Sequence, residues 1–301
     1  MDNRDKFGVE PICKVLSEHG CTIAPSTFYE ALSRRPSRRA VRDQQVLELI
    51  MTERGSSVFV AGLGARKMWL RLRGMGHEVA RCTVERLMTG AGLVGVTRQR
   101  GPRTTVPDPA AERPADLVDR NFTATAPNQL WVADFTYVPT WSGMAYVAFV
   151  FDVFARCILG WRVATTMTTP LVLDCLEMAI WSRQREGRHN LTGLVHHNDA
   201  GSQYTSIAFT DRLVETGIDP SVGSVGDAYD NALAESQIGI FKSELIYPHG
   251  PWRDRDHLEA AVMDWVHWFN TERTHESIDD FTPAQAEQLH YQYRAGLAEA
   301  S

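Results

Sequence analysis

The chain has 301 residues, 44% of them hydrophobic and 23% charged, which is the composition of a globular protein long enough for two domains. The longest apolar run, from Met144 to Phe154, contains Asp152 and is too short to cross a bilayer, and the charged N-terminus is unlike a signal peptide. The five cysteines include no C-x-x-C pair, so we expect no disulfide framework, no zinc knuckle and no membrane contact, and we expect a reducing cytoplasmic location.

The net charge of -6 conceals an uneven distribution along the chain. From Ala31 to Arg103 there are 15 Lys and Arg against 5 Asp and Glu, whereas the rest of the chain has 16 against 32. A basic region before an acidic remainder favours a DNA-binding unit joined to a domain that uses carboxylates. A solvated basic surface without a partner is the alternative.

Residues 1–50 are predicted to form a helical segment that resembles a helix-turn-helix. Ile12, Val15 and Leu16 give a helical stripe that ends near Gly20, and a turn, CTIAP, follows. Ser26 is a candidate N-cap for a second helix that begins at the next residue.

Residues 51–100 are predicted to form a second helix-turn-helix-like unit. The segment ARKMWLRLR, residues 65–73, is a basic amphipathic helix, Gly74 and Gly76 interrupt it, and another helix starts at Thr83. The apolar residues of this unit would form a small core: Trp69, Leu70, Leu72, Val84, Leu87 and Met88. The basic residues would remain outside and contact DNA: Arg66, Lys67, Arg71, Arg73, Arg81 and Arg86. A helical hairpin that only packs on the next domain is the alternative.

Residues 101–126, rich in Pro, Thr and charge, are predicted to be a linker, residues 127–290 a catalytic core with C-terminal helices, and residues 291–301 a tail. The core begins with three runs of β-branched and aromatic residues, which predict a meander of strands. The expected elements are strands at 130–140, 145–155 and 157–166, a helix at 169–184, a strand at 194–197, a helix at 206–216, a strand at 220–222, and helices at 230–247 and 257–273. This order predicts an α/β class and the RNase H-like fold, a mixed five-stranded sheet with helices on both faces.

Three acidic residues stand out in this arrangement. Asp134 lies in the middle of an apolar strand, where an ionised carboxylate is costly without a cation or several donors. Asp199 follows a buried strand directly, and Glu235 lies in a long helix with Asn231 one turn before it and Lys242 two turns after it. Carboxylate oxygens suit hard divalent cations, and two such ions support in-line phosphoryl transfer. Taken singly, each acid could be a cap, an ion-pair partner or a solvated charge; Asp152, at the end of a neighbouring strand, is such a residue.

At these residues the sequence resembles the large-reading-frame (OrfB-type) transposases of bacterial insertion-sequence family three, whose catalytic domain is similar to retroviral integrase. The matching segments are WVADFTYVPT, LVHHNDAGSQYTS, GDAYDNALAESQIGIFKSELI and WFNTERTHESIDDFTPAQA. Asp199 and Glu235 have 35 residues between them, and Lys242 stands seven after the Glu, as in the D,D-35-E pattern of that family.

The resemblance implies that Asp134, Asp199 and Glu235 are catalytic and hold two Mg²⁺ ions, with Mn²⁺ able to take their place. It implies that Lys242 contacts the DNA end, and that Asn231, Tyr229, Gln203 and Tyr204 support the site. The alternatives are an ordinary surface lysine at Lys242 and turn chemistry at Asn231 and Tyr229.

The resemblance further implies donor-strand cleavage and strand transfer of an insertion sequence through a circular intermediate, in the nucleoid region of a bacterial cytoplasm. The expected partners are terminal inverted repeats, target DNA, further copies of the chain and the product of a small upstream reading frame. A catalytically inactive DNA-binding regulator and a structure-specific nuclease of the same fold are the alternatives. Joined DNA product would distinguish a transposase from both, since the nuclease would cut DNA and never join it.

Overall fold

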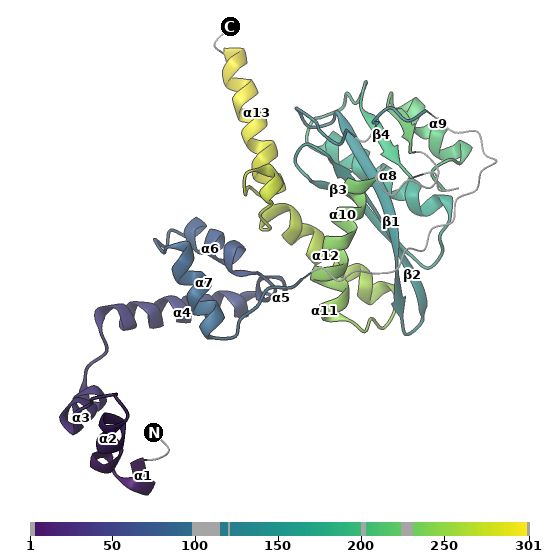
Figure 1. Cartoon of the computed structure of the whole chain (residues 1–301). Helices are drawn as coiled ribbons and strands as arrows, with labels where there is room; N and C mark the ends of the chain where they lie inside the picture. The colour runs from purple at the N-terminus through teal and green to yellow at the C-terminus, as the bar shows by residue number, and fades with distance from the viewer. Residues whose placement is uncertain (1–3, 98–114, 120, 200–202, 224–230, 300–301) are drawn as a thin grey trace.

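The computed structural model describes residues 4–97, 115–119, 121–199, 203–223 and 231–299 (Figure 1). An N-terminal group of helices, a second helical unit and a sheet-containing core follow one another along the chain, and the last helix extends away from the core. The predicted linker lies largely outside the described residues, as does Tyr229.

The N-terminal group consists of α1 (Arg4–Phe7), α2 (Val9–Glu18) and α3 (Pro25–Ser33). α3 begins earlier than predicted, because Pro25 occupies its first turn, where the fixed φ of proline suits a helix start. The predicted N-cap, Ser26, therefore lies inside the helix, and Ala24 stands at the cap position without a side-chain hydrogen bond.

The second helical unit contains α4 (Arg38–Ser56), α5 (Val58–Ala61), α6 (Ala65–Gly74) and α7 (Arg81–Gly90). α4 begins at the Ser37 N-cap, whose side chain accepts a hydrogen bond from the Ala40 N–H at 3.1 Å, and it runs through the predicted domain boundary at residue 50. Of the predicted small core, Trp69, Leu70 and Leu87 are only half-buried. The buried apolar residues of this unit are Val46, Ile50, Val60, Leu63, Met68, Leu72, Val84 and Met88.

The core contains a mixed five-stranded sheet in the order β3-β2-β1-β4-β5, which confirms the predicted fold class. β1 pairs antiparallel with β2 and parallel with β4, and β4 pairs parallel with β5. The strands are β1 (Leu130–Thr140), β2 (Gly143–Asp152), β3 (Ile158–Ala164), β4 (Val195–Asn198) and β5 (Asp219–Val222).

Helices cover both faces of the sheet, as predicted. One face packs on α8 (Thr169–Arg185) and α9 (Ile207–Glu215). The other packs on α10 (Ala232–Phe241) and α12 (Arg255–Thr271); between these, the chain forms a π-helical turn (Lys242–Ile246) and α11 (Tyr247–His249). The predicted helix at 230–247 is therefore one helical run with a change of hydrogen-bonding pattern after Phe241.

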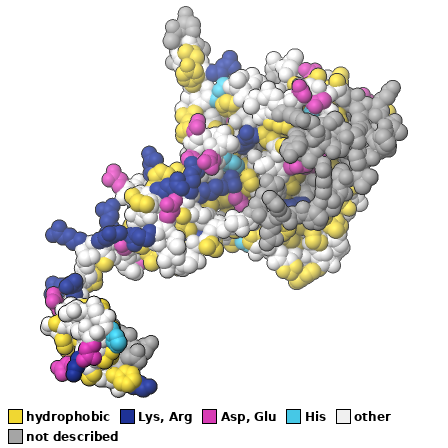
Figure 2. Space-filling model, in the orientation of Figure 1, with side chains coloured by type: hydrophobic (Ala, Val, Ile, Leu, Met, Phe, Trp, Pro, Cys, Tyr) yellow, Lys and Arg dark blue, Asp and Glu magenta, His cyan; other side chains and the backbone are white. Residues whose placement is uncertain are grey.

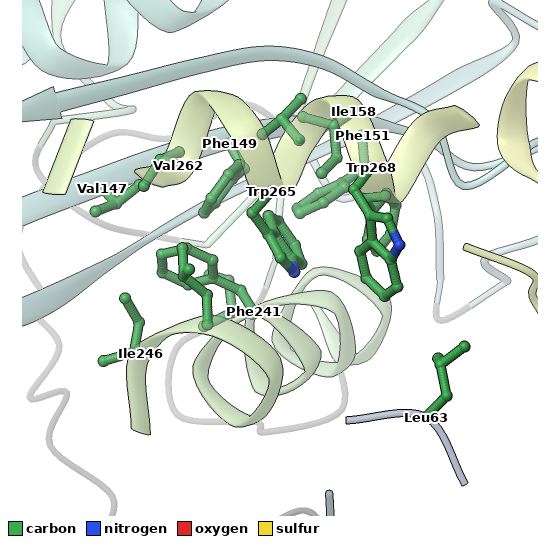
Figure 3. Packing of buried hydrophobic residues seen from close by; sticks show 14 of the residues in the cluster. Leu63, Val147, Phe149, Phe151, Ile158, Phe241, Ile246, Val262, Trp265 and Trp268 are labelled. Atoms are coloured by element: carbon green, nitrogen blue, oxygen red, sulfur yellow. The ribbon is translucent and has the colours of Figure 1, made fainter. Parts of the chain in front are cut away.

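An aromatic cluster fills the space between the sheet, α10 and α12 (Figure 3). Phe149 of β2 meets Phe241 of α10 with ring centroids 5.0 Å apart, and Phe241 meets Trp265 of α12 at 5.1 Å. All three rings are fully buried. Each such ring removes a large apolar area from water, so this cluster fixes α10 against the sheet.

On the opposite face, Gly160 of β3 allows α8 to approach closely. A Cβ at this position would lie 2.1 Å from the Cys175 carbonyl oxygen, so only glycine fits without displacing the helix.

The C-terminal segment comprises a 3₁₀ turn (Glu276–Ile278) and α13 (Pro283–Glu299), which continues through the predicted boundary at residue 290. The start of α13 is anchored by Arg183 of α8, which is completely buried and hydrogen-bonds Glu287 at 2.6 and 2.8 Å. The same guanidinium contacts Asp152 of β2 at 3.2 Å. Asp152, the acidic residue outside the motif, is therefore linked through Arg183 of α8 to the start of α13.

Candidate active site

Asp134 lies in β1, and Asp199 directly follows the end of the neighbouring strand, β4. The parallel register of β1 and β4 sets Ala133 opposite Asn198, and the two aspartates are the next residues along each strand. Adjacent strands are about 4.8 Å apart, and residues in parallel register point to the same face of a sheet. Strand pairing therefore brings together two acids that are far apart in the sequence.

Glu235 reaches the same region from α10. Asn231, immediately before the helix, is buried, and its side-chain amide donates a hydrogen bond to the Ala133 carbonyl oxygen at 3.0 Å. This bond ties the start of the helix to the residue beside Asp134. One turn later the Glu235 N–H donates to the Asn231 carbonyl oxygen at 3.0 Å, and the Glu235 side chain is exposed. Asn231 thus connects the start of the helix that carries Glu235 to β1.

The electrostatics of the site link the three acids. Burial raises the pKa of Asp134 well above its usual value, and repulsion from Asp199 and from Glu235 raises it further. A hydrogen bond from the Phe135 N–H at 2.7 Å and the positive charge of Lys242 act in the opposite direction. The site is thus a concentration of negative charge that its own residues only partly neutralise.

Lys242 stands at the edge of this charged region. Its Nζ lies 5.1 Å from the centroid of the exposed Tyr137 ring, which is within cation–π distance. The π-helical turn begins at this residue, and such turns frequently occur at functional sites. The sequence analysis assigned no role to Tyr137, because an offset of three residues along a strand normally places two side chains on opposite faces.

The two other supporting residues within the described ranges are buried. Gln203 donates to the Met167 carbonyl oxygen at 3.3 Å. Tyr204 packs with its ring centroid 6.0 Å from that of Phe135, beneath the strand that carries Asp134. Because Tyr204 is buried, its ring packs against the strand that carries Asp134 and does not face solvent.

The six basic residues predicted to contact DNA fall into two sets. Arg73, Arg81 and Arg86 are exposed. The other three, all on α6, are half-buried and turn towards the core, because acidic groups there pair with them. Arg66 hydrogen-bonds Asp280 at 2.5 and 2.6 Å, Lys67 lies 3.8 Å from Glu244, and Arg71 hydrogen-bonds Glu53 at 2.7 Å and Glu272 at 3.0 Å. The predicted exposure of these three side chains is therefore only partial, and their contact with DNA stays a prediction.

Within the described ranges, no three or more His, Cys, Asp and Glu side chains lie close enough together to hold a metal ion, so Asp134, Asp199 and Glu235 are not gathered into such a group. In the same part of the chain, no helix is long and apolar enough to span a membrane.

Comparisons with known families and proteins agree with this arrangement. Residues 124–228 and 216–283 match two families described as integrase core domains, and residues 43–101 match an HTH-like domain. A protein assigned as the transposase of insertion sequence element IS986/IS6110 of Mycobacterium tuberculosis is 56% identical, over 90% of this chain and 97% of its own length. The transposase of IS629 of Shigella sonnei is 45% identical, over 96% of this chain and 94% of its own length.

The chain belongs to the transposases of bacterial insertion sequences. The resemblance described from its motifs is confirmed, and with it the assignment to the polynucleotidyl transferases with an integrase core. Transposases of this superfamily act on DNA and use divalent metal ions. Among solved structures, the HTLV-2 integrase catalytic core domain in complex with magnesium is 16% identical, over 55% of this chain and 99% of that chain, with a TM-score of 0.41.

Proposed function

We propose that this transposase cleaves and joins the ends of its insertion sequence at a site formed by Asp134, Asp199 and Glu235. The observation that supports the proposal is the register of β1 and β4, in which Ala133 pairs with Asn198 and each aspartate is the next residue of its chain segment. The bond from Asn231 to Ala133 supports the place of Glu235 beside them.

The chemistry of these residues fits divalent cations. All three offer carboxylate oxygens, which Mg²⁺ and Mn²⁺ prefer. Burial, and after it the negative charge of Asp199 and Glu235, raises the pKa of Asp134, and a bound cation would act in the opposite direction. Asp134 and Asp199 would provide the two strand-borne ligands, and the exposed Glu235 would complete the set from its helix. When bound, two such ions would supply positive charge for the attacking and the leaving oxygens of a phosphoryl transfer.

The reaction consists of a hydrolysis followed by a transesterification on DNA. Water first attacks the phosphodiester at the element end, the bond to the departing 3′ oxygen breaks, and a free 3′-OH results. That 3′-OH then attacks a second phosphodiester, forms a new bond to phosphorus and releases another 3′-OH.

The chain's part is to hold the phosphate and the nucleophile in line. Lys242, held at Tyr137, would bind a phosphate oxygen beside the scissile bond. No covalent protein–DNA bond forms.

The partners follow from this reaction. Two ends of one element must meet, so we propose that several copies of the chain assemble on the terminal inverted repeats before they engage target DNA. The family resemblance suggests that the first target is the opposite end of the same element, which gives a circular intermediate. It also suggests that the product of a small upstream reading frame assists in binding the ends.

The test is Asp134→Asn, which keeps the shape of the side chain and removes its charge. We expect strand transfer on a DNA end to fall by at least about a hundredfold, because charge stabilisation in the transition state is lost. Affinity for the DNA end, measured by fluorescence anisotropy, should change little. Mn²⁺ should stabilise the unmodified chain against thermal unfolding more than it stabilises the variant.

Asp219→Asn is the matched control, because Asp219 is exposed at the start of β5, away from the proposed ligands. Full strand transfer by Asp134→Asn would refute the metal assignment. Cleaved but never joined DNA from the unmodified chain would indicate a nuclease, and DNA binding without either product an inactive regulator.

A further inference from the structure

Basic side chains of α6 form ion pairs with a group of acidic residues on the core of the same chain. Figure 2 shows Lys and Arg side chains along the helical unit and acidic side chains among them where that unit adjoins the core. The acidic members come from four positions in the C-terminal half of the chain: Glu244, Glu272, Glu276 and Asp280. Exposed ion pairs contribute little, but the side chains of Arg66 and Asp280 are only 32% and 25% exposed and their contact is bidentate.

A tight turn presents Asp280 to Arg66. Asp279 and Asp280 have φ values of 55° and 63°, a left-handed conformation that few residues other than glycine adopt. The turn is closed by hydrogen bonds from the Asp280 N–H to the His275 carbonyl oxygen at 2.9 Å and from the His275 N–H to the Phe281 carbonyl oxygen at 3.0 Å. The acidic partner is therefore held in place by the backbone.

Apolar contacts accompany the ion pairs. Phe59 of α5 packs on Trp268 of α12 with ring centroids 5.2 Å apart, and Leu63, in the loop before α6, is buried in the cluster that contains Trp268 (Figure 3). A continuous hydrophobic cluster between the helical unit and the core indicates stable packing, because separating the two would expose these side chains to water.

The contact reaches the helical run that carries the catalytic glutamate. Lys67 pairs with Glu244, which lies in the π-helical turn two residues after Lys242. Glu244 also accepts hydrogen bonds from Arg273 at 2.8 to 3.0 Å. A displacement of α6 would therefore remove a partner from the turn that orients Lys242.

We propose that α6 is the docking helix of the helix-turn-helix-like unit: its basic side binds the acidic surface of the core and holds the Lys242 turn in its working position. Arg66, Lys67 and Arg71 then serve as positioning residues, and DNA phosphates are left to the exposed arginines of the unit. The docking itself does not depend on the proposed function, which enters only through the strand-transfer readout.

A charge exchange tests the proposal. Arg66→Asp and Asp280→Arg, each alone, set like charges against each other, so both should lower the thermal unfolding temperature and reduce strand transfer by about tenfold, the effect of one broken, partly buried pair. The double variant should return to within about threefold of the unmodified chain, because the pair is restored in reverse. Affinity for a DNA end should stay within about twofold throughout. Arg35→Asp, at an exposed position between α3 and α4, is the control for the change in net charge and should leave the unfolding temperature unchanged.

The alternatives give different results. If α6 contacts DNA, Arg66→Asp weakens DNA binding, Asp280→Arg does not, and the double variant fails to recover; this overturns the proposal. If the contact is an inhibitory lock, Asp280→Arg increases strand transfer, which also overturns it. Unfolding temperatures report on docking even if the unmodified chain transfers no strands, so a failure of the proposed chemistry is distinguishable from a failure of the docking.

Discussion

One buried histidine, His275, makes the free energy of unfolding depend on pH. His275 is 5% exposed, and burial together with the charges of Arg273 and Lys67 lowers its pKa to about 2. Histidine in an unfolded chain has a pKa of about 6.5. Between these values the unfolded chain binds a proton that the folded chain does not. Stability contributed by neutral His275 is therefore present above pH 6.5 and is lost progressively as the pH falls.

We expect the free energy of unfolding to fall by about 2 kcal/mol between pH 7 and pH 5 on account of His275 alone. His275→Gln removes the titrating ring and should reduce this pH dependence by a similar amount. Urea denaturation at the two pH values measures the difference. His189→Gln, at an exposed position, should leave the dependence as it is, and an equal effect of both variants would contradict the assignment.

At the scale of elements, one buried cation connects β2, α8 and α13. Arg183 is 0% exposed, and its partners Asp152 and Glu287 are buried with it. Asp152 also accepts hydrogen bonds from the Asn128 N–H at 2.8 Å and the Phe154 N–H at 2.9 Å. Because so many groups share this guanidinium, its loss would leave two buried carboxylates without their cation.

Arg183→Met should therefore lower the free energy of unfolding by about 3 to 5 kcal/mol, the usual result of removing one partner of a buried ion pair. Arg185→Met, two residues later and exposed over the Trp181 ring, should cost less than about 1 kcal/mol. Equilibrium urea denaturation of both variants provides the comparison. Equal costs would show that the buried network contributes no more than a surface contact.

Elements with a clear local pattern were predictable from the sequence. β1 has the predicted bounds, 130–140, because its β-branched and aromatic residues favour an extended chain. α4 was missed, since its buried residues Val46 and Ile50 stand among polar and charged neighbours that hide the periodicity. α13 was missed because its anchor, Glu287, is explained only by Arg183, 104 residues earlier in the sequence.

At the scale of the whole molecule, long-range contacts decide which charges remain available to DNA. The partners of Arg66 and Arg71 on the core lie 214 and 201 residues away, so no local pattern could identify them, and the arginines looked free. The alternative of a helical hairpin packed on the next domain describes α6 better. Asp134, Asp199 and Glu235 were found through motif spacing, whereas the register that brings the aspartates together comes only from the sheet.

We expect this division of charge to be visible in the salt dependence of DNA binding. Arg81→Gln and Arg86→Gln, at exposed positions of α7, should each reduce the slope of log affinity against log salt by about 1, the effect of one lost phosphate contact. Arg66→Gln should leave the slope unchanged. Titrations of a DNA end at several salt concentrations measure all three. A reduced slope for Arg66→Gln would place that side chain on DNA.

β4 has only four residues, so its pairing with β1 cannot shift by one residue without moving Asp199. Side chains alternate between the two sides of a strand, so one additional codon within Val195–Asn198 would turn Asp199 away from Asp134 while most of the sheet stayed paired. An insertion sequence with such a copy would still be recognised at its ends yet would never move. We expect a marked element with one alanine inserted in β4 to lose its mobility in cells. Full mobility would show that the alignment of this short strand is not required.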